Sequence, residues 1–189
     1  MEGEFEIVLP YMRCASEEIT EEFKKDYELT GAAMNDLHAR GRKQLDVLLP
    51  QWEKADLSRR ISWVNREVEA LWSSPYAYAL MVVDSAMGAM GDHGKPVRLL
   101  GAWENSLYAW LMGMTREEPE ERDPAEFIRE PLVLEVRQED RQFCSSALLG
   151  FSWVFGLNLR IRNGSDFLLL PAGQQEHPDA PVIRVLCTE

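Results

Sequence analysis

The sequence has few cysteines and histidines, and neither residue type occurs in a catalytic or metal-binding pattern. The three cysteines, Cys14, Cys144 and Cys187, are far apart and form no CxxC pair, which argues against a zinc ribbon and a disulfide framework. The three histidines show no HExxH or paired-ligand spacing. We therefore predict no metal and no cofactor, and we expect free thiols in a reducing cytoplasm.

The short signatures of common enzymes are also missing. The chain contains no GxGxxG, no GxxxxGK(S/T) and no GxSxG. Two features keep a chemical role open: Cys144 as a nucleophile with His93 or His177 as its base, and Asp84, which the apolar sequence around it predicts to be buried. For both we favour the structural alternative, a small buried thiol and a hydrogen-bonded acid. A non-enzymatic role is therefore the preferred interpretation.

Long apolar runs and a secretion signal are absent from the sequence. Residues 77–90 and 99–114 are the most apolar windows, but polar residues interrupt them and they fall short of the ~20 residues that span a bilayer. The N-terminal residues 1–6 lack the basic start of a signal peptide. We expect both windows to form buried helices of a cytoplasmic protein.

Basic charge is scarce, and the acidic charge is unevenly distributed. The net charge is −12 and the pI is about 4.8, so nucleic acid and anionic membranes are poor candidate partners. Residues 1–28 hold nine acidic and three basic side chains, and residues 116–130 hold seven and three. This pattern favours a surface that meets a basic protein.

The length and composition predict one domain over residues 1–189, because 189 residues with 46% apolar content suit a single core. The helix and strand patterns that follow predict that this domain is α+β. Helical spacing predicts helices over 16–50, 56–71, 76–90 and 103–111, and a further helix over 140–155. Alternation predicts strands over 5–9, 132–136, 157–162, 166–170 and 182–187, with Asn163-Gly164 as a type I′ hairpin turn. We expect the helical half to pack on a mostly antiparallel sheet that includes the N-terminal strand, with the strand order left open.

The first candidate site is a proline-bounded acidic loop over residues 115–124. It lacks apolar periodicity, and its acids would attract a basic partner: Glu117, Glu118, Glu120, Glu121 and Asp123. The structural alternative is a solvated loop with no function. Trp63 lies off the apolar stripe of its helix, so we expect it to be exposed and to add a binding hot spot. The core is the expected place of Trp103, Trp110 and Trp153.

The second candidate site is the predicted sheet face that carries Arg137, Arg160, Arg162 and Arg184 beside Glu135. Guanidinium groups bind planar anions through paired hydrogen bonds, which indicates an anion or carboxylate site. In the structural alternative, these arginines pair with acids of the same chain or face water.

We therefore expect a non-enzymatic cytoplasmic interaction protein that binds and neutralises a basic protein partner through its acidic surface. In size and charge it is similar to inhibitors such as the immunity proteins that block toxins, an analogy that identifies no family. The alternative is a small-molecule or anion-binding domain, including an enzyme, that uses the arginine-bearing face. A homo-oligomer with tryptophans at its interface stays open as well.

Overall fold

The computed structural model describes residues 39, 43–44, 46–51, 53–72 and 74–189. The predicted strand over 5–9 and most of the predicted helix over 16–50 lie outside the described residues. The described C-terminal end of this predicted helix is a short 3-10 turn, η1 (Leu49–Gln51), which contains Pro50, the residue expected to stop the helix.

The described residues form one five-stranded sheet. Its strands are β1 (Val97–Leu100), β2 (Leu132–Arg137), β3 (Leu157–Asn163), β4 (Asp166–Pro171) and β5 (Val182–Thr188), in the spatial order β1-β2-β5-β4-β3. The β2–β5 pair is parallel, and the other three pairs are antiparallel. The sheet is thus mixed and mostly antiparallel, and the α+β fold class is confirmed.

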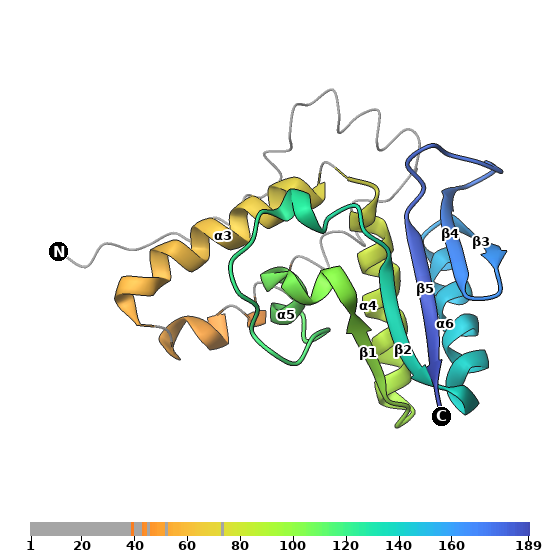
Figure 1. Cartoon of the computed structure of the whole chain (residues 1–189), viewed down its shortest axis with the longest axis horizontal. Helices are drawn as coiled ribbons and strands as arrows, with labels where there is room; N and C mark the ends of the chain where they lie inside the picture. Colours follow the sequence, from red (N-terminus) through yellow and green to blue (C-terminus); the bar gives the residue numbers. More distant parts are fainter. Residues whose placement is uncertain (1–38, 40–42, 45, 52, 73) are drawn as a thin grey trace.

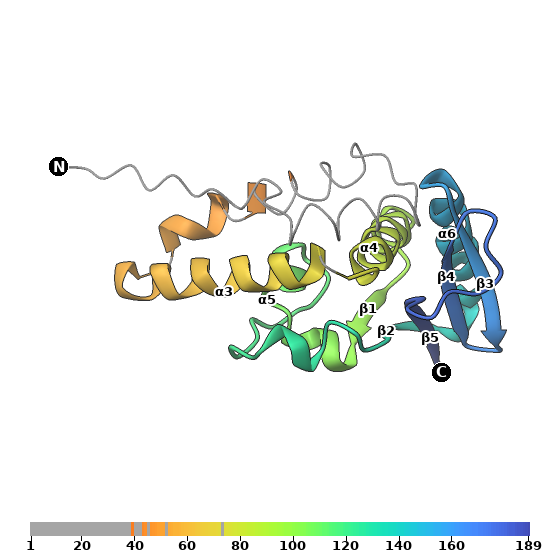
Figure 2. The same ribbon diagram turned by 90° about the horizontal axis from the view of Figure 1, so that it is seen from above.

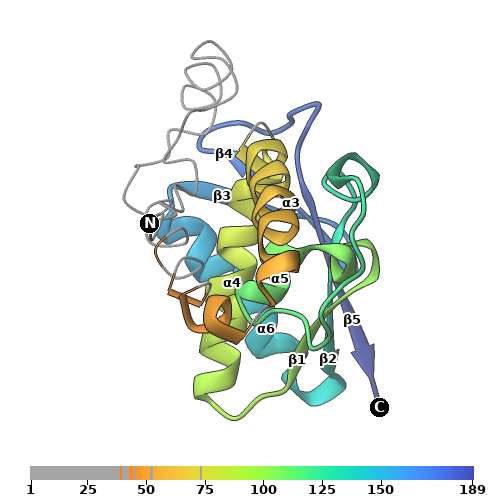
Figure 3. The same cartoon turned by 90° about the vertical axis from the view of Figure 1, so that its left-hand side faces the viewer.

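Helices α4 (Tyr76–Asp92) and α6 (Arg141–Val154) lie together on one face of the sheet (Figure 1, Figure 2). Helix α3 (Lys54–Trp72) extends away from the sheet and packs against the short α5 (Leu107–Leu111), as the side view shows (Figure 3). Two 3-10 turns, η2 (Gly101–Asn105) and η3 (Pro124–Glu126), complete the part beside α3. Among the described helices, none is both long and apolar enough to cross a membrane.

The core is centred on α4, where apolar residues occur on every face of the helix. Eleven of its seventeen residues are buried, including Leu80 and Val83 at 0% exposure. The sheet contributes its inward side chains by alternation, so that Leu132, Leu134 and Val136 are buried while Val133 and Glu135 are half-buried. A helix buried on all sides is the arrangement that such a sequence favours.

Strand β1 and the helical segment after it differ from the sequence prediction. Residues 99 and 100 belong to the window 99–114 that was expected to form a buried helix, but residues 97–100 form a strand that pairs with β2, with Leu99 opposite Leu134. Gly101 then adopts a φ of +77°, which ends the strand. The predicted helix over 103–111 is split into η2 and α5, because Ser106 adopts an extended conformation and caps α5.

The predicted hairpin of β3 and β4 is confirmed, but its turn lies one residue later than expected. Asn163 pairs with Asp166 across the strands, so Gly164 and Ser165 form the turn. The Asn163 side chain accepts a 3.0 Å hydrogen bond from the backbone N–H of Asp166, which stabilises this turn in place of a type I′ geometry starting at Asn163.

Trp153 is the tryptophan for which the core prediction is wrong, since it is 79% exposed. The inward stripe of α6 is Cys144, Leu148 and Ser152, and Trp153 lies one residue, about 100° around the helix, beyond that stripe. Trp103 is buried as predicted, and Trp110 packs partly buried against the core.

Candidate functional site

The acidic loop is attached to α3 by ion pairs. Glu121 accepts a 3.0 Å hydrogen bond from Arg59 and also contacts the guanidinium of Arg66, while Glu118 contacts Arg60. Asp56 accepts hydrogen bonds of 2.8 Å from both Arg59 and Arg60, so its carboxylate orients the two guanidinium groups instead of capping the helix. Two of the predicted partner-binding acids therefore have partners within the chain.

These arginines carry a sequence signal that charge counting missed. Arg59 and Arg66 are seven residues apart, which places them on the same face of a helix. A basic face on one helix and an acidic loop elsewhere in the chain are natural partners. Glu118 and Glu121 thus have ion-pair partners on α3, and the binding of a basic protein by this loop stays a prediction.

Asp123 caps the 3-10 turn η3. Its carboxylate accepts a 3.0 Å hydrogen bond from the N–H of Ala125, with Pro124 at the first position of η3. By contrast, Glu117 and Glu120 are exposed and make no ion pair within the described part of the chain. The five predicted acids thus divide into three with structural partners and two without.

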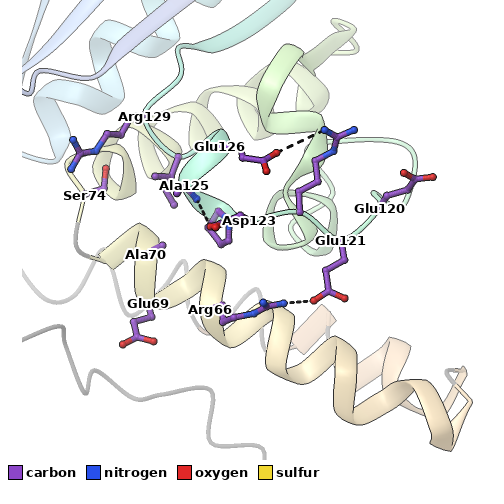
Figure 4. Close-up of a pocket in the computed structure, with 13 residues that line it drawn as sticks. Arg66, Glu69, Ala70, Ser74, Glu120, Glu121, Asp123, Ala125, Glu126 and Arg129 are labelled. Carbon is purple, nitrogen blue, oxygen red and sulfur yellow. Dashed lines mark hydrogen bonds and ion pairs between the residues drawn. The ribbon is translucent and has the colours of Figure 1, made fainter.

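An open groove lies between α3 and the segment 120–129, with a volume of about 1190 Å³ (Figure 4). In the figure, Arg66 of α3 reaches toward Glu121 on the opposite wall, and Ala70 lies on the α3 wall while Ala125 lies on the opposite one. The acidic lining residues are Glu69, Glu120, Glu121, Asp123 and Glu126. The basic lining residues are Arg66, Arg122 and Arg129.

Only some of the charged side chains that line the groove form ion pairs with other residues of the described part of the chain. Glu69 and Glu120 form no ion pair with described residues, and the Arg122–Glu126 contact is long, at 3.9 Å between exposed side chains. Exposed pairs of this kind contribute at most about 1 kcal/mol. An incoming guanidinium or ammonium group can therefore replace Arg122 at Glu126 at little cost.

Two buried hydrogen-bonded groups, which the sequence did not reveal, hold the parts around the groove together. Glu67 of α3 is 2% exposed and accepts hydrogen bonds from the Ser106 hydroxyl and from the N–H groups of Leu107 and Tyr108. Burial raises the pKa of Glu67, and these hydrogen bonds oppose the rise. The indole N–H of Trp103 donates a 2.8 Å bond to the Glu130 carbonyl and so fixes the end of the acidic segment.

Trp63 is buried, and the prediction of an exposed hot spot is wrong. Only 2% of its surface is accessible, and it belongs to the core cluster. Helix α3 packs against α4 on one side and α5 on another, so a residue beside the main apolar stripe still faces protein. The segments that cover Trp63 were not visible in the periodicity of its own helix.

On the arginine-bearing sheet face, Arg184 and Arg137 pair with acids of the same chain. Arg184 donates two hydrogen bonds to Asp166, at 2.6 and 2.9 Å, and holds the pKa of that carboxyl below its ordinary value. Arg137 binds Asp140, whose pKa is lowered first by Lys95 and then by Arg137. The anion-binding role of this face stays a prediction.

Arg160 and Arg162 complete this face. Arg160 donates a 2.8 Å bond to the Gln175 carbonyl, and Arg162 is exposed beside the irregularity of β3. The cavities on either side of the acidic segment are lined by other residues.

The two residues that kept enzyme chemistry open have structural surroundings. Cys144 is fully buried in α6, and burial raises the pKa of its thiol to about 11. Asp84 is 7% exposed, as predicted, and lines a cavity of about 470 Å³ with Met87 and Met112. In the described residues, no three His, Cys, Asp or Glu side chains are arranged to hold a metal ion.

Comparisons with protein-family models, with curated proteins and with solved structures each find no match to this chain.

Proposed function

We propose that this protein binds a basic segment of a partner protein in the groove between α3 and residues 120–129. The observation that supports the proposal is the mixed lining of the groove, in which the apolar residues Ala70, Pro124 and Ile128 accompany five carboxylates. A segment with alternating Lys or Arg and small apolar residues would satisfy both kinds of lining residue. The role is non-catalytic binding.

The charges of the protein would act in two steps: they attract a basic partner over a distance, and groove carboxylates then pair with its basic side chains. The net charge of −12 attracts a protein of high pI over distances of a Debye length, about 8 Å at physiological salt. At the groove, an incoming basic side chain meets Glu69 and Glu120, which have no ion-pair partner among the described residues. It also competes with Arg122 for Glu126. Neutralisation of a basic toxin, as an immunity protein performs it, is one form of this function.

We place this binding in the cytoplasm. The thiols of Cys144 and Cys187 are both unbridged, which suits a reducing compartment.

The test compares two variants with equal loss of charge. The groove variant carries Glu69→Gln, Glu120→Gln and Glu126→Gln, and the matched control carries Glu139→Gln, Glu176→Gln and Asp179→Asn, which are exposed and lie outside the groove. The probe is a fluorescein-labelled peptide of alternating arginine and alanine, measured by anisotropy at low and physiological salt. We expect the groove variant to lose about tenfold or more in affinity and the control to lose far less.

Two results would contradict this function. Equal weakening of both variants would mean that the peptide senses net charge alone. Unchanged binding by the groove variant would place the interaction on another surface of the protein.

A further inference from the structure

The sheet ends at β3 with an apolar patch, which we define as Leu149 and Trp153 of α6 with Ile161 of β3. These side chains are 55%, 79% and 67% exposed, values typical of charged surface residues. β3 is the last strand in the order β1-β2-β5-β4-β3, so one side of its backbone has no strand partner among the described residues. Open edges with apolar side chains favour the addition of another strand.

The three residues of the apolar patch belong to two elements that pack together, because α6 and β3 form a helix–strand hairpin. The chain reverses at Gly156, and β3 then runs back along α6, with which it is in contact. Ile161 is on the inward face of β3, the face toward α6, since it alternates with the outward Arg160. Leu149 and Trp153 are one helical turn apart, and the opposite flank of α6 bears Phe143, which packs on Lys95 and His93 beyond the end of α4.

The other face of β3 is basic. Arg160 and Arg162 are exposed, so a strand that pairs with this edge meets apolar side chains on one face and guanidinium groups on the other. Two copies of β3 paired with each other would bring these arginines together, and like charges opposite one another destabilise a strand pair. The edge therefore calls for a strand that alternates apolar and acidic residues.

One segment of this chain has that pattern. Residues 4–9, which lie outside the described residues, read Glu-Phe-Glu-Ile-Val-Leu, so that Phe5, Ile7 and Leu9 alternate with Glu4 and Glu6. We propose that residues 4–9 add to the open edge of β3 as a sixth strand, with their apolar side chains on the apolar patch and their glutamates beside Arg160 and Arg162. Cross-strand pairs of opposite charge and of apolar side chains both stabilise a sheet.

The length of the chain permits this addition. Residues 10–38 separate the segment from the described residue Ala39. With residues 16–38 helical, as the sequence predicts, they span about 35 Å and residues 10–15 add about 20 Å, a reach of about 55 Å. That reach exceeds the dimensions of a domain of this size, so the connection does not restrict which sheet edge the segment meets. The choice of edge then follows from side-chain complementarity.

Hydrogen exchange measured by mass spectrometry on the full chain tests the proposal. We expect the amides of residues 157–163 to be protected in the wild type and to exchange about tenfold faster or more in Glu4→Arg/Glu6→Arg. Residues 132–137 and 182–188 should exchange as before, which shows that the variant is folded. The matched control Glu17→Arg/Glu21→Arg makes the same charge change outside the segment and should leave β3 unaffected.

The decisive experiment exchanges the charges between residues 4–9 and β3. Adding Arg160→Glu and Arg162→Glu to Glu4→Arg/Glu6→Arg should restore the protection of β3, because the cross-strand pairs then have opposite charge again. The milder Glu4→Gln/Glu6→Gln should raise exchange in the same direction by a smaller factor. Unchanged exchange in β3 in these variants, or no restoration in the charge exchange, would overturn the proposal. A dimer in light scattering that these variants dissociate would mean that the added strand comes from a second copy, which would overturn the intrachain assignment.

Discussion

Glu67 and Ser106 hold each other in a buried hydrogen bond that joins α3 to α5. The Ser106 hydroxyl donates to the Glu67 carboxylate at 2.8 Å, and the same hydroxyl oxygen accepts the N–H of Ala109 at 3.0 Å. The carboxylate also accepts the N–H groups of Leu107 and Tyr108. One acidic side chain thus accepts hydrogen bonds from the backbone N–H groups at the start of α5, which have no partner within the helix.

Glu67→Gln should destabilise the protein by about 1–3 kcal/mol, because the amide places an N–H₂ group against donors that need an acceptor. Urea denaturation followed by circular dichroism measures this change. Glu69→Gln is the matched control on the same helix; it is exposed, and its effect should be within about 0.5 kcal/mol. Equal effects of the two substitutions would show that the hydrogen bonds of Glu67 contribute little.

Trp103→Phe should cost about 1–3 kcal/mol, since it removes the hydrogen bond to the Glu130 carbonyl and part of a side chain that is 1% exposed. The loss should also increase proteolysis within residues 115–130, which this bond helps to fix. Val154→Ala, at a valine that is 66% exposed and lies outside the apolar patch, is the control and should change stability by about 0.5 kcal/mol or less. An equal or larger cost for Val154→Ala would contradict the assignment of Trp103 as the buried anchor.

The Arg184–Asp166 pair should make stability depend on acid pH. Because the pKa of Asp166 is lowered in the folded state, the pair stabilises fully above the ordinary aspartate pKa of about 3.9. That stabilisation is lost as the pH falls through the lowered pKa. The difference in urea midpoint between wild type and Arg184→Gln should therefore be constant from neutral pH downward and shrink in strong acid. Arg129→Gln, at an exposed arginine that has no ion pair among the described residues, should show no such convergence.

Cys144 should resist alkylation in the folded protein. Burial raises the pKa of its thiol to about 11, so at pH 8 about one molecule in a thousand carries the reactive thiolate. Iodoacetamide treatment with peptide mass spectrometry should find Cys144 unmodified in buffer and modified in urea, while the half-buried Cys187 reacts sooner. Rapid labelling of Cys144 in buffer would indicate an activated thiol and would reopen its role as a nucleophile.

Regular elements were predictable where one periodicity extends over many residues. Helix α3, helix α4, helix α6 and the β3–β4 hairpin follow from spacing alone, because each exposes a consistent apolar face to the core. Strand β1 was missed because four residues hold too little alternation to distinguish a strand from a turn. Its existence depends on pairing with Val133 to Val136, a contact with residues far along the chain.

The sequence identified the acidic residues of the candidate site, but not the residues that they contact in the fold. The acidic loop was identified from charge, and in the structure Asp123 caps η3. The pairing of Glu121 with Arg59 and Arg66 is tertiary: the seven-residue spacing of the two arginines marks a basic helix face but does not tell which segment meets it. Trp63 and Trp153 were assigned to the wrong environments for the same reason, since burial depends on which neighbouring elements cover a helix flank.

The position of β5 has a consequence for the order of folding. This strand joins β2 to β4, so without it β1–β2 and β3–β4 are separate strand pairs, each at best marginally stable in water. The pairing of β2 with β5 links residues 132–137 to residues 182–188, across all of α6, β3 and β4. Contacts of this sequence separation form slowly. During synthesis on the ribosome, the two halves of the sheet must therefore wait for residues 182–188 to emerge before they join into one cooperative unit.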